Sequence, residues 1–157
     1  MTIPYRGRTG DGTYFITASC FQKQCLLQSE TMAGLFTDVL YHYQKQGRYL
    51  LHEFVVMPNH FHLQITPLPP VTLEKAVQFI KGGFSYRAKK ELGFLQEIWQ
   101  TSFYDHRVRD TYEHARFRHY IHVNPVRRGL APAPEEFPYS SAKLVLDEVP
   151  QRLKPAA

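Results

Sequence analysis

The pattern that most limits the possible fold is the strict alternation of polar and apolar residues from His60 to Thr66. An alternation of period two places successive side chains on opposite faces of a β-strand. The polar face of this strand would carry His60, His62, Gln64 and Thr66. Tyr49 to Met57 reads as a second strand, and Pro58 and Asn59 separate the two stretches. The sequence therefore predicts a β-hairpin.

Two amphipathic helices are predicted on either side of this hairpin. Ser29 can cap a helix that stops at Gly47, and Thr72 can cap a helix that runs to about Leu92, with Gly93 beyond its end. The second helix is basic through Lys75, Lys81, Arg87, Lys89 and Lys90.

The remaining elements lie at the two ends of the chain. Residues 13–21, rich in β-branched and aromatic residues, predict a first strand, and residues 98–108 predict a fourth. Asp110 and Glu113 have the spacing of a capping box, so a third helix should begin there and run to about Asn124, where Pro125 closes it. From Ala131 onward, proline and charge predict a short helix or turn followed by a flexible end.

This order of elements predicts an α+β fold, a ferredoxin-like (RRM-like) antiparallel sheet with helices on one face and an additional C-terminal helix. The chain has 157 residues, of which 43% are hydrophobic, enough for one core. We expect a single domain over residues 1–145 and a flexible tail over residues 146–157.

Composition limits the environment and the partner. Lys and Arg outnumber Asp and Glu by 19 to 14, which suits a polyanionic partner without identifying one. Residues 1–10 lack the apolar stretch of a secretory signal, and no run of about 18 apolar residues is present. A cytoplasmic, soluble protein without membrane contact is therefore expected. Cys20 and Cys25 are interpreted as reduced packing residues.

Two histidines stand side by side on the polar face of the predicted strand. Neutral imidazoles bind divalent metals well, and His60 and His62 would be held in place before a metal arrives. The alternative is a polar strand face that happens to carry two histidines. For a His-x-His pattern taken alone, that alternative is favoured.

A second pair lies on the third predicted helix. Tyr120 and Asn124 are four residues apart, so both side chains project from the same face. Tyr120 could equally pack in the core while Asn124 ends the helix before Pro125. Taken alone, this pair also favours the structural interpretation.

Taken together, the motifs resemble a known family. TYFITASCF, VVMPNHFHLQI, IKGGFSYR, IWQTSFYDHRVRD, YIHVNPVRRGL and YSSA occur in this order over nearly the whole chain. The chain resembles the REP-associated tyrosine transposases, relatives of the single-tyrosine HUH transposases of insertion sequences. The resemblance implies that Tyr120 is the nucleophile, that His60 and His62 are metal ligands flanking Phe61, and that Asn124 is the third ligand.

The resemblance also implies a reaction and a partner. Attack by Tyr120 on single-stranded DNA at or near a hairpin (REP-like) element would leave a 5′-phosphotyrosine and a free 3′-hydroxyl, with Mg²⁺ or Mn²⁺ as cofactor. Relatives work as monomers or homodimers, and both states stay open. The sequence does not identify the base that deprotonates the tyrosine.

Candidate DNA contacts follow from charge and aromatic character. Bases could stack on aromatic rings and phosphates could pair with cations. The candidates are Lys81, Tyr86, Arg87, Trp99, Phe103, Tyr104, Arg116, Arg118, Arg127 and Arg128. For each residue taken alone, core packing of the aromatic ring or a solvated surface charge is the favoured alternative.

Three alternatives to the transposase stay open. A non-catalytic module that binds single-stranded RNA or DNA predicts metal-independent binding and no covalent product. A metal-dependent phosphodiesterase with water as nucleophile predicts cleavage that survives Tyr120→Phe. A domesticated protein that has lost cleavage would bind its element without cutting it.

Overall fold

The computed structural model describes residues 12–143, so the N-terminal ten residues and the predicted tail over residues 146–157 lie outside the described part. Within it, four strands and three long helices follow one another in the predicted order. They are β1 (Thr13–Ser19), α1 (Glu30–Lys45), β2 (Tyr49–Met57), β3 (His60–Pro67), α2 (Leu73–Leu92), β4 (Tyr104–Val108) and α3 (Thr111–Arg127). Two short 3-10 helices, η2 (Phe21–Lys23) and η3 (Pro134–Glu136), complete the described elements.

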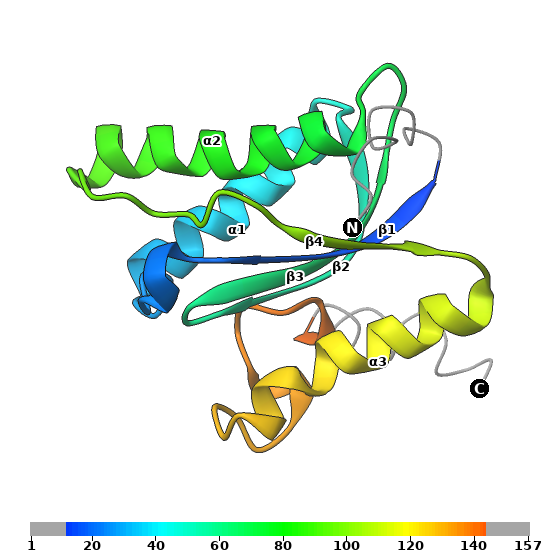
Figure 1. Ribbon diagram of the computed structural model, residues 1–157. Coiled ribbons are helices and arrows are strands. Elements are labelled where there is room, and N and C mark those ends of the chain that lie inside the picture. The colour runs from blue at the N-terminus through cyan, green and yellow to red at the C-terminus, as the bar shows by residue number, and fades with distance from the viewer. Residues whose placement is uncertain (1–11, 144–157) are drawn as a thin grey trace.

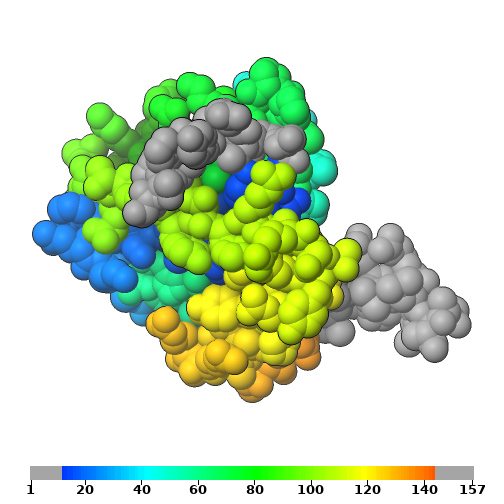
Figure 2. All heavy atoms as spheres, turned by 45° about the vertical axis from the view of Figure 1, so that its right-hand side comes forward, coloured from blue at the N-terminus to red at the C-terminus, as the bar shows by residue number. Residues whose placement is uncertain are grey.

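The strands form one antiparallel sheet in the order β2-β3-β1-β4. Helices α1 and α2 lie on one face of this sheet, and α3 lies on the opposite face (Figure 1). The space-filling view shows that α3 (yellow) and the β4 segment (yellow-green) form one continuous surface (Figure 2). The predicted ferredoxin-like fold with an additional C-terminal helix is confirmed.

Helix starts are set by the predicted caps. The Ser29 hydroxyl accepts a hydrogen bond from the Met32 N–H at 3.1 Å, and the Thr72 hydroxyl accepts one from the Lys75 N–H at 3.2 Å. Such caps satisfy backbone donors that the first helical turn leaves without partners. Gly93 ends α2 in the left-handed region, with φ at 67°, where glycine is favoured.

The cap of α3 differs in one detail from a capping box. Asp110 accepts from the Glu113 N–H at 2.9 Å, as the pattern predicts. The Glu113 carboxylate, however, accepts from the N–H of Arg109, one residue before the cap, at 2.9 Å. It also pairs with the Arg109 guanidinium at 2.6 Å, which holds the pKa of Glu113 well below its usual range. The turn between β4 and α3 is therefore fixed by polar contacts.

The main core lies between the sheet and the α1/α2 layer. Phe36 of α1 packs against Phe61, Phe84 and Trp99, with ring centroids 4.7, 5.4 and 5.7 Å away. The indole N–H of Trp99 donates to the Lys81 carbonyl at 3.0 Å, so its one polar atom is satisfied inside the protein. This aromatic cluster fixes α1 and α2 on the apolar face of β3.

Two element boundaries were predicted wrongly. The fourth strand begins at Tyr104, not at Ile98, because Ile98 and Trp99 are buried in the main core and Trp99 makes only an isolated bridge to Cys20. Helix α3 continues through Pro125 to Arg127. Proline removes a single N–H donor, Pro125 is buried inside the helix, and the last turn is still closed by the Arg128 N–H, which donates to the Asn124 carbonyl at 3.1 Å.

Several smaller predictions can also be compared with the structure. The short turn expected after Ala131 is present as η3. Both cysteines are free, and Cys20 is buried as a packing residue, but Cys25 is exposed, so the packing prediction is wrong for Cys25. Among the described residues, no helix is long and apolar enough to cross a membrane.

Candidate active site

Helix α3 packs on the polar face of the sheet through a small apolar cluster of Phe15, Val55, Met57 and Ile121. The Phe15 ring is stacked against Phe117 of α3, at a centroid distance of 4.4 Å, and against the His62 imidazole, at 5.4 Å. Phe15 therefore fixes the distance between the helix and the histidine strand.

Tyr120 lies at the edge of this cluster. Its ring centroid is 5.2 Å from that of His62 and 5.9 Å from that of Phe15. The side chain is 37% exposed, so its ring is held by neighbours while the residue stays accessible from solvent. The structure thus brings together the predicted nucleophile and one predicted ligand, which are 58 positions apart in the printed sequence.

The two histidines are oriented by hydrogen bonds at their Nδ1 atoms. Thr17 is paired directly with His62 in the β1–β3 register, and its hydroxyl lies 2.7 Å from His62 Nδ1. His60 Nδ1 lies 2.7 Å from the Asn59 side-chain oxygen. Both partners can accept a proton from Nδ1, which leaves the lone pair on Nε2. The two rings are 4.8 Å apart and both are buried.

The surroundings keep these imidazoles neutral. Burial lowers the pKa of His60 to about 4, and the charges of Arg128 and Lys23 contribute in the same direction. Burial also lowers the pKa of His62 to about 3, with smaller contributions from His60 and Arg128. A neutral imidazole offers a lone pair, so both histidines are in a form that can bind a metal at neutral pH.

Three buried polar atoms between the polar sheet face and α3 have no hydrogen-bond partner among the described residues. They are Nε2 of His62, Oδ1 of Asn124 and Oε1 of Gln64, and the first two belong to predicted metal ligands. Asn124 is 4% exposed and follows Tyr120 by one turn of α3. Buried polar atoms are nearly always hydrogen-bonded, so the two on His62 and Asn124 need a partner that the described residues do not supply.

Other groupings of ligands are absent from the described part of the chain. Within residues 12–143, no group of three or more His, Cys, Asp or Glu side chains is placed to hold a metal ion. The ligand set of His60, His62 and Asn124, with two imidazole nitrogens and one amide oxygen, stays a prediction.

Two pockets meet at Thr17, His62 and Tyr120. One has a volume of about 490 Å³ and is lined by Phe15, Thr17, His62, Tyr104, Arg116, Phe117, His119, Tyr120 and Arg127. The other has a volume of about 280 Å³ and is lined by Thr17, Ser19, Lys23, Asn59, His60, His62, Tyr120 and Arg128. Each pocket contains two cations near the tyrosine, which suits an anionic ligand.

Four of the ten predicted DNA contacts lie at these pockets. Tyr104, Arg116 and Arg127 line the larger one, and Arg128 lines the smaller one. Tyr104 is 57% exposed and lies on β4, so its ring is available for stacking.

Arg118 is an exposed residue of α3 that lines neither pocket, and Phe103 is half-buried against the main core. The remaining four predicted contacts lie with the α1/α2 layer, across the sheet from Tyr120. Trp99 is buried among core aromatics, and it therefore presents no free ring face for a base. Lys81 donates to the carbonyls of Gln100 and Ser102 at 2.8 and 3.3 Å, and so holds the loop before β4. Arg87 pairs with Glu91 at 2.7 Å. Tyr86 is exposed on α2.

Sequence reasoning missed four residues at the site. Phe15 and Thr17 hold His62, and the alternation along the first strand could have placed them on one face with it. Lys23 lies in η2 and approaches His60 only through the fold. His119, next to Tyr120 on α3, lines the larger pocket.

Known proteins with similar sequences were found. The sequence model of the family described as "Transposase IS200 like" matches residues 11–124. An Escherichia coli K12 protein named REP-associated tyrosine transposase is 25% identical over 132 residues, covering 83% of this chain and 76% of the relative. An uncharacterized protein of Haemophilus influenzae Rd is 28% identical over 147 residues, covering 74% of this chain and 81% of the relative.

A solved structure shares the fold. It is a REP-associated tyrosine transposase bound to a REP hairpin, and it superposes with a TM-score of 0.73 at 24% identity, covering 87% of this chain and 80% of its own. The family match spans most of the chain, including β1, the histidine strand and the helix up to Asn124. The chain therefore belongs to the IS200-like transposase family, the class of enzyme that its sequence motifs predicted.

Proposed function

We propose that this protein is a metal-dependent single-stranded DNA transesterase that cleaves and rejoins DNA at or near hairpin elements through a 5′-phosphotyrosine intermediate. Tyr120 is the nucleophile in this proposal. His60, His62 and Asn124 hold a divalent cation, Mg²⁺ or Mn²⁺. The proposal rests on membership of the transposase family and on the side chains that surround Tyr120.

The observation that carries the proposal is the pair of unpartnered buried atoms, His62 Nε2 and Asn124 Oδ1, on elements that face each other beside Tyr120. Both atoms offer lone pairs and neither has a proton to donate to the other, so a cation is a partner that both can bind. Two nitrogens and one oxygen leave coordination positions for water and phosphate, as a catalytic site requires. When bound, the cation would withdraw charge from a non-bridging phosphate oxygen.

The chain's own residues prepare the attack. Thr17 and Asn59 fix the ring orientation of the two histidines, and Phe15 holds the ring of Tyr120 edge-on. The Tyr120 oxygen forms a bond to phosphorus as the bond from phosphorus to the 3′-oxygen breaks. The tyrosine proton is lost, and the departing 3′-oxygen gains a proton. The phosphodiester energy is kept in the tyrosine ester, so the reverse reaction rejoins the strand.

Charge and shape favour DNA as the substrate. Lys23 and Arg128 in the smaller pocket, and Arg116 and Arg127 in the larger one, lie on either side of Tyr120. A strand crossing the tyrosine would meet cations in both directions, and a base could stack on Tyr104. A relative of the same fold was solved with a REP hairpin, which supports a hairpin as the partner here.

The proposal is tested by trapping the covalent intermediate. Wild type, Tyr120→Phe and Tyr112→Phe are each mixed with labelled single-stranded hairpin DNA, with and without Mn²⁺, and separated on a denaturing gel. Tyr112 is the matched control, because it is a 72% exposed tyrosine of the same helix and lines neither pocket. We expect a Mn²⁺-dependent shifted band for wild type and Tyr112→Phe and none for Tyr120→Phe.

Other outcomes identify the alternatives. An adduct that persists in Tyr120→Phe would show that another residue is the nucleophile. Cleavage without any adduct, surviving Tyr120→Phe, would identify water as the nucleophile. Binding with neither cleavage nor adduct over varied hairpins and both metals would identify a binding module.

A further inference from the structure

A bulge in β2 changes which residues this edge strand presents to α3. The register with β3 shifts between Leu51 and Glu53, so His52 is an extra residue. The contacts place both His52 and Glu53 on the α3 side: the His52 ring lies 5.5 Å from that of His114, and Glu53 contacts His122. A bulge commonly redirects a side chain next to a functional site. Here it gives α3 a ring contact with His52 and a hydrogen bond with Glu53.

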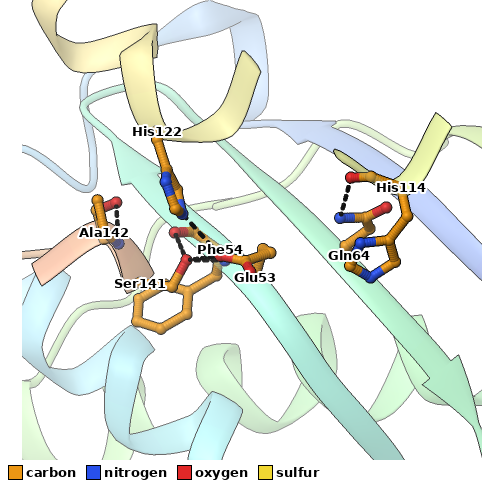
Figure 3. A network of polar contacts seen from close by, with 8 residues as sticks. Glu53, Phe54, Gln64, His114, His122, Ser141 and Ala142 are labelled. Atoms are coloured by element: carbon orange, nitrogen blue, oxygen red, sulfur yellow. Dashed lines mark hydrogen bonds and ion pairs between the residues drawn. The ribbon is translucent and has the colours of Figure 1, made fainter. Parts of the chain in front are cut away.

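The stronger of these contacts is centred on the Glu53 carboxylate. Its Oε1 atom lies 2.7 Å from Nε2 of His122 and 2.7 Å from the hydroxyl of Ser141, and both groups donate to it (Figure 3). A carboxylate only accepts, so His122 carries its proton on Nε2. Glu53 and Ser141 are 7% and 5% exposed, so these charge-assisted bonds are shielded from water.

Ser141 belongs to a segment that covers the outer edge of β2. Its hydroxyl accepts from the Phe54 N–H at 3.0 Å, the Val56 N–H donates to the Tyr139 carbonyl at 2.8 Å, and Ser140 forms a bridge with Val55. Glu53 therefore joins three separate parts of the chain: the edge strand, the segment after η3 and helix α3.

The contact on α3 falls at a position that matters for the site. His122 lies between Tyr120 and Asn124, within a single turn of the helix. Phe15 and Ile121 hold this turn from the middle of the sheet, and Glu53 holds it from the sheet edge. Apolar packing alone permits small rotations and slides of a helix, whereas directional bonds to a buried carboxylate restrict them.

We infer that Glu53 is a positioning residue for the transesterification: through His122 it sets the rotation of α3 that aligns Tyr120 with the phosphate. Ser141 supports it by ordering the same carboxylate oxygen. This inference rests on the proposed function of Tyr120. Glu53 itself touches neither the pockets nor the two histidines of the site.

The test compares Glu53→Ala with Glu53→Gln and with Glu91→Ala. Glu91 is the matched control, because its carboxylate also bonds a nitrogen-containing side chain, Arg87, but lies on α2, across the sheet. Adduct formation is followed in a single turnover at saturating hairpin DNA and Mn²⁺. The amplitude of adduct formation measures the fraction of folded, active molecules. The rate constant reports how well Tyr120 is aligned with the phosphate. We expect Glu53→Ala to lower the rate constant about 10- to 100-fold at full amplitude, with hairpin Kd changed less than about threefold.

The conservative variant separates positioning from loss of the side chain. Glu53→Gln keeps an acceptor oxygen, so its rate constant should stay within about fivefold of wild type. Glu91→Ala should match wild type. A wild-type rate constant for Glu53→Ala, or a loss of amplitude alone, would overturn the inference. If Glu53→Ala does not fold, Ser141→Ala takes its place. The required result is then a lower rate constant at full amplitude, with a smaller reduction than the one expected for Glu53→Ala.

A second readout keeps the inference separate from the proposed function. Amide hydrogen exchange of residues 118–124 should accelerate about tenfold in Glu53→Ala and remain unchanged in Glu91→Ala. If wild type forms no adduct, the proposed function fails, and unchanged exchange would then show that Glu53 does not hold the helix either. Accelerated exchange without adduct would reduce the inference to a helix anchor and refute the catalytic part.

Discussion

Thr17→Val removes a single hydroxyl next to the site with almost no change of shape. In the structure this hydroxyl lies 2.7 Å from His62 Nδ1 and favours the form of the ring that has its lone pair on Nε2. Losing an outer partner of a metal-binding histidine typically costs 10- to 100-fold in metal affinity, or about 1.4–2.8 kcal/mol. The lost hydrogen bond should also lower the free energy of unfolding by about 1 kcal/mol.

The assay is the Mn²⁺ concentration that gives half-maximal adduct formation, together with direct calorimetric titration of the free protein with Mn²⁺. Thr13→Val is the control, because Thr13 lies on the same strand as Thr17 but away from His60 and His62. Its hydroxyl forms a hydrogen bond with the Thr66 hydroxyl at 2.6 Å. Both variants should lose a few degrees of Tm, about 2–4 °C. Only Thr17→Val should need 10- to 100-fold more Mn²⁺. Equal Mn²⁺ requirements for the two variants would refute the reasoning.

Three further predictions follow from burial and charge. Trp99→Ala should lower the free energy of unfolding in urea by about 3–5 kcal/mol, because it empties the centre of the main core; a loss below about 1 kcal/mol would contradict that packing. Tyr104→Ala should weaken hairpin binding in fluorescence anisotropy by about 1–3 kcal/mol, and an unchanged Kd would exclude base stacking there. Because the folded pKa values of His60 and His62 are lowered to about 4 and 3, the unfolded chain takes up protons first below pH 6.5. Stability should therefore fall between pH 6.5 and 5, by about 2 kcal/mol per histidine at pH 5, and His62→Gln should flatten this slope in pH-dependent urea denaturation; equal slopes would contradict it.

The parts of the fold that the sequence predicts well are those with local causes. Ser29, Thr72 and Asp110 each announce a helix start, since a capping side chain acts within three residues of itself. The alternation around His62 defines a strand and its two faces without knowledge of any partner. Helix starts and strand faces could accordingly be read directly.

The errors come from interactions between distant segments. Burial of Trp99 against Phe36 and Phe84 moved the start of β4, and α3 continues through the buried Pro125. The residue types and sequence neighbours of Trp99 and Pro125 do not reveal these two boundary changes. A base-stacking role for Trp99 was plausible only while its partners were unknown.

At the candidate site, the sequence indicated which residues to consider but not what supports them. The pairing of Thr17 with His62 follows from strand register, and Lys23 reaches His60 through the turn after β1. The contact of Glu53 with His122 depends on a bulge that removes the simple alternation of β2. Such relations need the assembled sheet.

The sheet separates two regions with different tolerance to mutation. The large aromatic core lies with α1 and α2, whereas the tyrosine, the histidines and the asparagine lie with α3. Substitutions that improve packing around Phe84, or that add exposed ion pairs to α2, would raise the melting temperature without reshaping the pockets. For protein engineering, one layer can be optimised for robustness while α3 and its loops are varied for new DNA targets.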